Sequence, residues 1–143
     1  MNKLRCASTI AVLLFTLASC GDANNKSKPS DGEPVAAAKP TGEDIYKKNC
    51  VACHQGNGEG VPGAFPPLAK SDYLADKEKT ISQVIKGSSG EITVNGKTFT
   101  GTMPAQQLND DEVAAVLTYV YGNLGNSGGA VTPAEVKAIR DKH

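Results

Sequence analysis

The sequence predicts a single all-α domain of about one hundred residues, built from three to five short helices and one β-hairpin. Several apolar runs of helical spacing begin directly after a helix-capping residue. One Asn-Gly pair separates two short alternating runs, which is the pattern of a hairpin. The first forty residues have the composition of an export signal followed by a linker, so we expect the folded part to begin near residue 41.

The N-terminus predicts export and lipid attachment. Lys3 and Arg5 precede an apolar run from Ile10 to Ala18, which is typical of a secretory signal and too short to span a bilayer. Residues 17–20 read LASC, which resembles the lipobox of bacterial lipoproteins. We therefore expect residues 1–19 to be a lipoprotein signal peptide and Cys20 to be acylated. The alternative is an ordinary cleavable signal in which Cys20 is incidental.

Residues 20–40 are expected to form a lipid-anchored flexible linker, and residues 41–143 the folded domain. The linker has no aromatic residue and is rich in Gly, Pro, Ser and Asn, so it cannot bury enough surface to fold. Its root-mean-square reach is about 25 Å. The domain contains ten Lys and Arg against twelve Asp and Glu. It therefore lacks the excess of positive charge that is typical of domains that bind nucleic acid.

The expected helices follow from their start signals. Thr41 caps a helix that carries Glu43 and Asp44 in its first turn and runs into Cys50. Further helices are expected over residues 76–86, from Asn109 to about residue 121, and over 132–142. The hairpin is expected over residues 92–99, and residues 122–129 read as a turn-rich link.

One motif carries the chemistry of the chain. Cys50-Val51-Ala52-Cys53-His54 has the C-x-x-C-H pattern of covalent c-type haem attachment. Two thiols add to the two vinyl groups of one porphyrin, and the histidine that follows lies under the iron as its proximal ligand. We therefore expect one covalent haem c, with an iron centre, and export agrees with attachment outside the cytoplasm.

Three other interpretations of the motif remain. A redox dithiol also uses C-x-x-C, but no strand-then-helix unit surrounds it here. A structural zinc site needs four ligands, and the other histidine of the chain is the terminal His143. The third is a chance occurrence of the pentapeptide without a cofactor.

Met103 is the candidate for the sixth iron ligand. It is the only methionine after residue 1 and lies in Gly101-Thr102-Met103-Pro104, outside any periodic apolar run. The alternatives are a methionine that only fills a gap in the core and coordination by His143. Met and His together fill both axial positions, which favours electron transfer over catalysis. We therefore expect an electron carrier and no catalytic residues.

Around this motif, roughly residues 41–124 resemble the class I cytochromes c, small helical folds around one haem. In that family a Gly and an aromatic precede the first Cys by eight and four residues, as Gly42 and Tyr46 do here. They pack on an aromatic of a later helix, which Tyr119 matches. The resemblance places Tyr46 among the residues that form the haem pocket.

The resemblance also assigns Pro66 and Leu68. A family Pro about twelve residues after the proximal His accepts the Nδ1 proton of that His through its carbonyl, and a following Leu packs on the haem. Pro66 and Leu68 match these positions, and such a hydrogen bond fixes the orientation of the ligand. The alternative for Pro66 is a rigid turn alone.

The hairpin before Met103 and the added helix after Gly129 are similar to the cytochrome domains fused to some copper nitrite reductases. The resemblance implies a monomeric carrier that shuttles single electrons from a respiratory donor to an acceptor such as a nitrite reductase or terminal oxidase. The export signal and the lipobox-like residues 17–20 predict a lipid-anchored position on the periplasmic side of a bacterial membrane. The alternative is a permanent haem subunit of an oxidoreductase complex.

Overall fold

The computed structural model describes residues 39–142, and within them the chain is mainly helical, as predicted. The elements in order are α1 (Gly42–Asn49), α2 (Val51–His54), the 3-10 helix η1 (Asp72–Ala75), α3 (Lys77–Lys86), β1 (Ile92–Val94), β2 (Lys97–Phe99), α4 (Asp110–Asn123) and α5 (Pro133–Asp141). In this part of the chain no helix is both long and apolar enough to cross a membrane. The expected signal peptide, Cys20 and nearly all of the expected linker lie outside the described residues.

The helix starts have the predicted capping geometry. At α1, the Thr41 hydroxyl accepts a hydrogen bond from the Asp44 amide at 3.2 Å, and the Asp44 carboxylate accepts one from the Thr41 amide at 3.0 Å. Such a reciprocal pair satisfies two backbone donors that the helix itself leaves free. The same arrangement starts α4 at Asn109 and Glu112, and α5 at Thr132 and Glu135.

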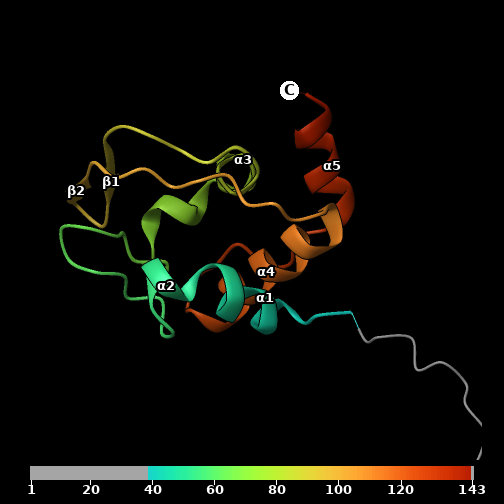
Figure 1. Cartoon of the computed structure of the whole chain (residues 1–143), viewed down its shortest axis with the longest axis horizontal. Coiled ribbons are helices and arrows are strands. Elements are labelled where there is room, and N and C mark those ends of the chain that lie inside the picture. Colours follow the sequence, from blue (N-terminus) through green and yellow to red (C-terminus); the bar gives the residue numbers. More distant parts are fainter. Residues whose placement is uncertain (1–38, 143) are drawn as a thin grey trace, which may run out of the picture. The chain divides into compact units, whose positions relative to one another are not determined.

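The centre of the domain is the packing of α1 against α4 (Figure 1). Gly42 lets the two backbones approach closely, because a methyl group at this position would lie 2.9 Å from Cβ of Tyr119 and even closer to the Ala115 carbonyl. One turn further along α1, the rings of Tyr46 and Tyr119 lie 5.4 Å apart at an angle of 44°. The expected contact of Gly42 and Tyr46 with Tyr119 is therefore confirmed.

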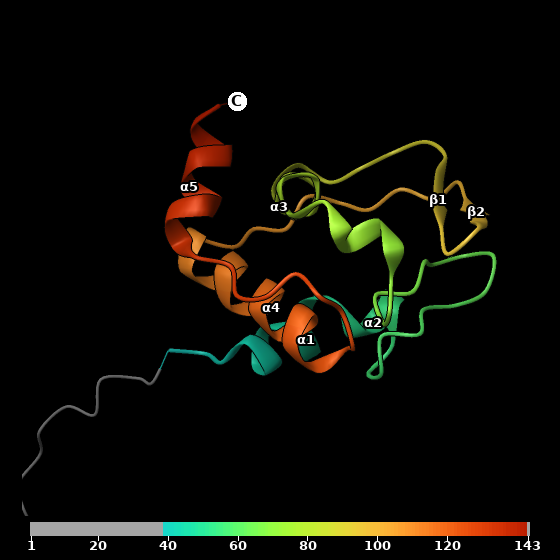
Figure 2. The same cartoon turned by 180° about the vertical axis from the view of Figure 1, so that it is seen from behind.

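The last helix, α5, packs on α3 and α4, and the hairpin lies at the opposite end of the domain (Figures 1 and 2). Val136 of α5 is completely buried and Ile139 is nearly so. A short link precedes the helix, and there Thr118 of α4 both donates to the Val131 carbonyl at 3.2 Å and accepts from the Val131 amide at 2.9 Å. The added helix is thus part of the folded domain.

The hairpin has the two-residue turn that its sequence predicts. Asn95 and Gly96 both have positive φ, 49° and 73°, as a type I′ turn requires. Ile92 pairs with Phe99 and Val94 with Lys97 in the antiparallel register. This register buries Val94 and Phe99 on the side that faces the cavity described below.

Candidate cofactor-binding site

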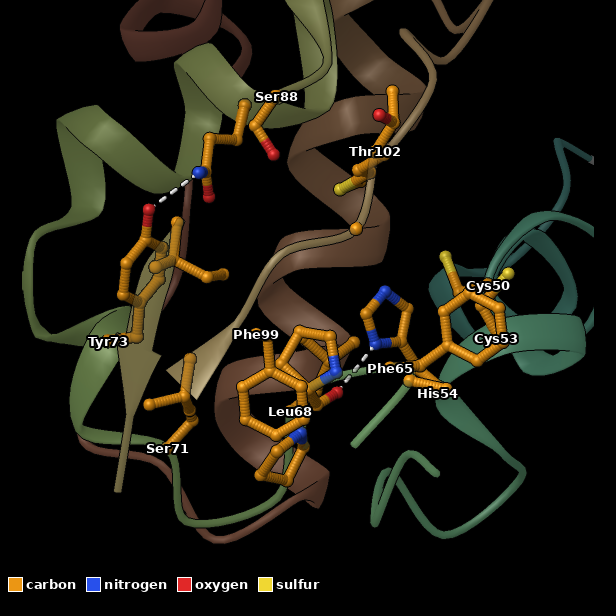
Figure 3. Close-up of a pocket in the computed structure, with 18 of the residues that line it drawn as sticks. Cys50, Cys53, His54, Phe65, Leu68, Ser71, Tyr73, Ser88, Phe99 and Thr102 are labelled. Atoms are coloured by element: carbon orange, nitrogen blue, oxygen red, sulfur yellow. Dashed lines mark hydrogen bonds between the residues drawn. The ribbon is translucent and has the colours of Figure 1, made fainter. Parts of the chain in front are cut away.

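A cavity of about 140 Å³ lies between α2, the hairpin and the segment around Met103 (Figure 3). Six of the seven cofactor-binding residues expected from the sequence line it: Cys50, Cys53, His54, Pro66, Leu68 and Met103. A smaller adjoining cavity shares Cys50, His54, Leu68 and Met103 with it. The fold therefore brings residues that are up to 53 positions apart in the sequence to one apolar space.

The two cysteines of the motif lie on the α2 side of the cavity, beside the His54 ring (Figure 3). The amides of Cys53 and His54 both donate to the Cys50 carbonyl, at 3.2 and 2.9 Å, which closes one tight helical turn. The two cysteines form no disulfide with each other. Burial, with a smaller effect from Cys53, raises the pKa of the Cys50 thiol to about 11. The sulfur atoms of both cysteines thus lie at one edge of the cavity.

The His54 ring is oriented by Pro66. Its Nδ1 lies 2.9 Å from the Pro66 carbonyl oxygen, and because a carbonyl can only accept, Nδ1 carries the proton. The Nε2 lone pair is therefore free to bind a metal ion. Burial lowers the pKa of His54, although the bond to Pro66 opposes this effect, so the ring is neutral at pH 7. The expected His54–Pro66 hydrogen bond is present in the structure.

The Met103 backbone is fixed by the turn that follows α3. The amide of each residue in the Ser88–Met103 pair donates to the carbonyl of the other at 2.9 Å. In Figure 3, Ser88 and Thr102 lie across the pocket from His54. Gly87 makes this contact possible, because its φ is +77° and a methyl group there would lie 2.8 Å from the Ala105 amide nitrogen. Gly87 directly follows the helix expected over residues 76–86, where a glycine is a common C-terminal signal.

The Leu68 segment is held by Asn126, which lies in the predicted turn-rich link. The Asn126 amide nitrogen donates to the Leu68 carbonyl at 2.8 Å and to the Val120 carbonyl at 3.0 Å. Its carbonyl oxygen accepts from the Ser71 amide at 2.9 Å. Nothing local in the sequence indicates this role, because Asn126 is more than fifty residues away from Leu68 and Ser71.

Tyr46, the seventh expected residue, does not line the cavity. Its side chain is 1% exposed, and its hydroxyl donates to the Gln55 carbonyl at 2.7 Å, directly after His54. Burial raises the pKa of this phenol to about 12. Tyr46 therefore supports the turn that carries His54, and its connection to the cavity is indirect.

Polar donors that the sequence did not single out line the same cavity near η1. The Ser71 hydroxyl is buried and has no hydrogen-bond partner among residues 39–142. The Tyr73 hydroxyl accepts from the Gln83 amide at 2.7 Å and keeps its own proton to donate (Figure 3). A haem combines a large apolar ring with two carboxylate groups. The apolar lining, the two thiols, the free His54 nitrogen and these hydroxyl donors together fit such a group.

Comparison with known proteins identifies the family. The model of the family described as cytochrome c matches residues 40–123. The chain belongs to the cytochrome c family. It is 39% identical over 119 residues to cytochrome c-552 of Thermus thermophilus, covering 76% of this chain and 80% of that protein. It is also 31% identical to the cytochrome c subunit of the quinone alcohol dehydrogenase of Gluconacetobacter polyoxogenes, covering 79% of this chain and 26% of that protein.

A third relative is the Cbb3-type cytochrome c oxidase subunit CcoP of Azospirillum brasilense, which is 32% identical over 76% of this chain and 39% of that protein. Membership of the cytochrome c family confirms the expected class I fold and a covalently bound haem c with its iron. It also shows an electron carrier and not an enzyme. The α5 helix lies beyond the part of the chain that the family model matches.

Proposed function

We propose that this cytochrome c is a membrane-tethered carrier that shuttles single electrons between a respiratory donor and a terminal reductase or oxidase. The observation that carries the proposal is the cavity in which Cys50, Cys53, His54 and Met103 come together. Bound haem supplies the reversible one-electron couple of its iron. The residues of the chain hold that group, keep water from most of it and fix the ligand geometry.

Each residue of the cavity has a defined part in this proposal. The thiols of Cys50 and Cys53 would hold the porphyrin edge covalently, His54 would coordinate the iron through Nε2, and Met103 would coordinate it through the thioether sulfur. Pro66 keeps the proton on Nδ1 of His54, and Leu68 covers the ring. Because His54 and Met103 would both bind the iron, no position would be left open for oxygen or peroxide.

Tethering is proposed from the N-terminal sequence. Acylation at Cys20 would anchor the chain, and residues 21–40 would let the domain reach partners about 25 Å from the membrane surface. The experiment is fractionation of cells that produce the wild-type protein or the Cys20→Ala variant. The wild type is expected in the membrane fraction with an acylated Cys20 by mass spectrometry, and the variant in the soluble periplasm. Equal distribution of the two proteins would refute the tether.

A permanent place in an oxidoreductase complex is the second candidate, favoured by the relatives that are dehydrogenase and oxidase subunits. The two functions differ in how the protein behaves after gentle solubilisation of membranes. A mobile carrier, which we expect to be a monomer, elutes alone at the size of its own chain. A subunit co-elutes with a larger dehydrogenase or oxidase in fixed proportion.

A further inference from the structure

Met103 lies in a stretch of chain that has little secondary structure of its own. Residues 100–109, which we call the Met103 segment, connect the end of β2 at Phe99 to the start of α4 at Asp110. Within this segment the structure shows an isolated bridge in which Met103 pairs with Ser88. Because no helix or strand fixes the segment, its position depends on individual contacts with the rest of the fold.

The first of these contacts join the segment to the end of α3. Met103 and Ser88 each donate an amide hydrogen bond to the carbonyl of the other at 2.9 Å, and Ser88 lies two residues beyond the end of α3. The Gln106 amide donates to the Val84 carbonyl of α3, also at 2.9 Å. These bonds hold the segment as far as residue 106.

The end of the segment is held by Arg140, in the last turn of α5. Its guanidinium donates through Nη2 to the Leu108 carbonyl at 3.0 Å and through Nε to the Asp110 carboxylate at 2.8 Å. These two acceptors lie on either side of Asn109, the residue that caps α4. One planar side chain therefore bridges the end of the Met103 segment and the first turn of α4, a task that suits the fixed fork of a guanidinium group.

The ion pair between Arg140 and Asp110 is partly buried. The two side chains are 39% and 29% exposed, whereas those of Lys137 and Asp141, which pair within α5, are 65% and 60% exposed. Exposed ion pairs contribute little, because water screens them and both side chains lose freedom. A charged donor that is partly shielded from water forms a stronger hydrogen bond. We therefore expect Arg140, and not Lys137, to fix the Met103 segment measurably.

Leu108 connects this contact to the cofactor site. Its side chain lines the smaller of the two cavities, which His54 and Met103 also line. Leu108 is half-buried and packs against the hydrophobic core. By holding the Leu108 backbone, Arg140 fixes part of the wall of the space that Met103 shares with His54.

The α5 helix is itself firmly attached to the domain. It packs on α3 and on α4 (Figure 2), with Val136 completely buried and Ile139 nearly so. At its start, Nζ of Lys77 in α3 lies 3.5 Å from a Glu135 carboxylate oxygen and donates to the Ala130 carbonyl at 2.9 Å. The helix is therefore a rigid support for the side chains that it carries.

We infer that Arg140 is a positioning residue for Met103, which holds the end of the Met103 segment so that the methionine side chain stays in the cavity. The inference rests on the proposed role of Met103 as an iron ligand. The support comes from a helix that lies beyond residues 40–123, the part of the chain that the family model matches. Loss of the Arg140 contacts should let the Met103 segment leave the cavity more often.

Binding of added imidazole to the oxidised holoprotein measures how often the segment leaves. Imidazole can reach the iron only while the methionine sulfur is away from it, so the apparent affinity for imidazole is proportional to the open fraction. A hydrogen bond to a charged group typically changes an equilibrium tenfold or more, and solvent weakens this partly exposed pair. We therefore expect Arg140→Gln to raise the apparent affinity for imidazole roughly tenfold.

Three further variants serve as controls. Lys137→Gln removes one positive charge from the same helix, but its ammonium donates to Asp141 within α5, so the affinity should stay within about twofold of the wild type. Ile139→Val removes a buried methylene group and lowers the stability of the domain while leaving the Arg140 contacts in place. It should also leave the imidazole affinity unchanged. Arg140→Lys should recover part of the wild-type behaviour, since lysine keeps the charge but lacks the fork.

Native-state hydrogen exchange of the same holoproteins follows the segment without added ligand. The amides of Met103 and Gln106 form the bonds to the end of α3, so they exchange when the segment opens. We expect Arg140→Gln to accelerate their exchange roughly tenfold. In Ile139→Val their exchange should match that of the wild type, because opening of the segment does not uncover the Ile139 side chain.

The outcomes separate this inference from the proposed function. A wild-type protein without the absorption band of methionine-bound haem iron would overturn the proposed ligand set, and the inference with it. If the band is present but Arg140→Gln has the imidazole affinity and the Met103 exchange rate of the wild type, the positioning role is overturned while the carrier is not. Increases of equal size in Arg140→Gln and Ile139→Val would show that Arg140 acts only on the stability of the domain, and would also overturn the inference.

Discussion

Asn126 provides the most specific test of how the cofactor pocket is held together. Asn126→Ala removes three hydrogen bonds, to the Leu68 and Val120 carbonyls and from the Ser71 amide. The Val120 carbonyl still accepts from the Leu124 amide at 3.3 Å. The Leu68 carbonyl and the Ser71 amide have no other partner among the described residues, so the variant leaves two backbone groups unsatisfied.

The expected loss follows from these two groups. Leaving a buried polar group without a partner costs about 1–3 kcal/mol, and Ser71 is buried while Leu68 is half-buried. Water can reach the Leu68 carbonyl in part, so we expect Asn126→Ala to lower the free energy of unfolding by about 2–4 kcal/mol. The loss is large because the native stability of a domain this size is only about 5–15 kcal/mol.

Chemical denaturation of the holoprotein, followed by far-ultraviolet circular dichroism and by haem absorption, measures this loss. The control is Asn123→Ala, whose exposed amide donates to the Tyr119 carbonyl within its own helix at 3.1 Å. The control substitution should lower the free energy of unfolding by no more than about 0.5 kcal/mol. Equal losses for the two variants, or a loss below about 0.5 kcal/mol for Asn126→Ala, would refute the reasoning.

Two further substitutions test the packing around the ligands. Gly87→Ala should lower the free energy of unfolding, measured in denaturant titrations, by about 1–3 kcal/mol. The reason is that any side chain is strained at a φ of +77° and that the added methyl group would crowd the Ala105 amide. A variant as stable as the wild type would contradict this close contact between Gly87 and Ala105. Tyr46→Phe should remove the bond to the Gln55 carbonyl and cost about 0.5–1.5 kcal/mol at pH 7. Burial raises the pKa of the Tyr46 phenol from its ordinary value of 10.0 to about 12, so the phenol loses its proton at higher pH in the folded state than in the unfolded state. The wild type therefore loses stability as the pH rises above 10. The advantage of the wild type over Tyr46→Phe should therefore shrink above pH 10, and an advantage that stays constant to pH 12 would contradict the buried phenol.

Local signals in the sequence predicted most of the secondary structure. The reciprocal caps at Thr41, Asn109 and Thr132 and the Asn95-Gly96 turn all depend on residues within three positions of one another, so a single sequence contains them. The 3-10 helix η1 was not predicted. Its four residues include neither a capping signal nor enough length for a helical pattern.

The site was predicted as far as its residues form short motifs or match a known family. Cys50, Cys53 and His54 lie within five consecutive residues, whereas Pro66 and Leu68 were predicted from the family resemblance. Ser71 and Arg140 could not be predicted, because their roles depend on contacts across the fold. The Ser71 hydroxyl becomes significant only once its burial in the cavity is known, and Arg140 reaches its partner Leu108 across 32 positions.

The binding of haem between His54 and Met103 is tested most directly by the absorption spectrum of the oxidised, purified holoprotein, compared with that of Met103→Ala. We predict that the wild type shows the weak long-wavelength band expected for methionine bound to oxidised haem iron. The variant should lose this band while the haem remains covalently attached and His54 remains bound. A wild-type spectrum without the band at neutral pH, or a band that survives Met103→Ala, would contradict a haem held between His54 and Met103.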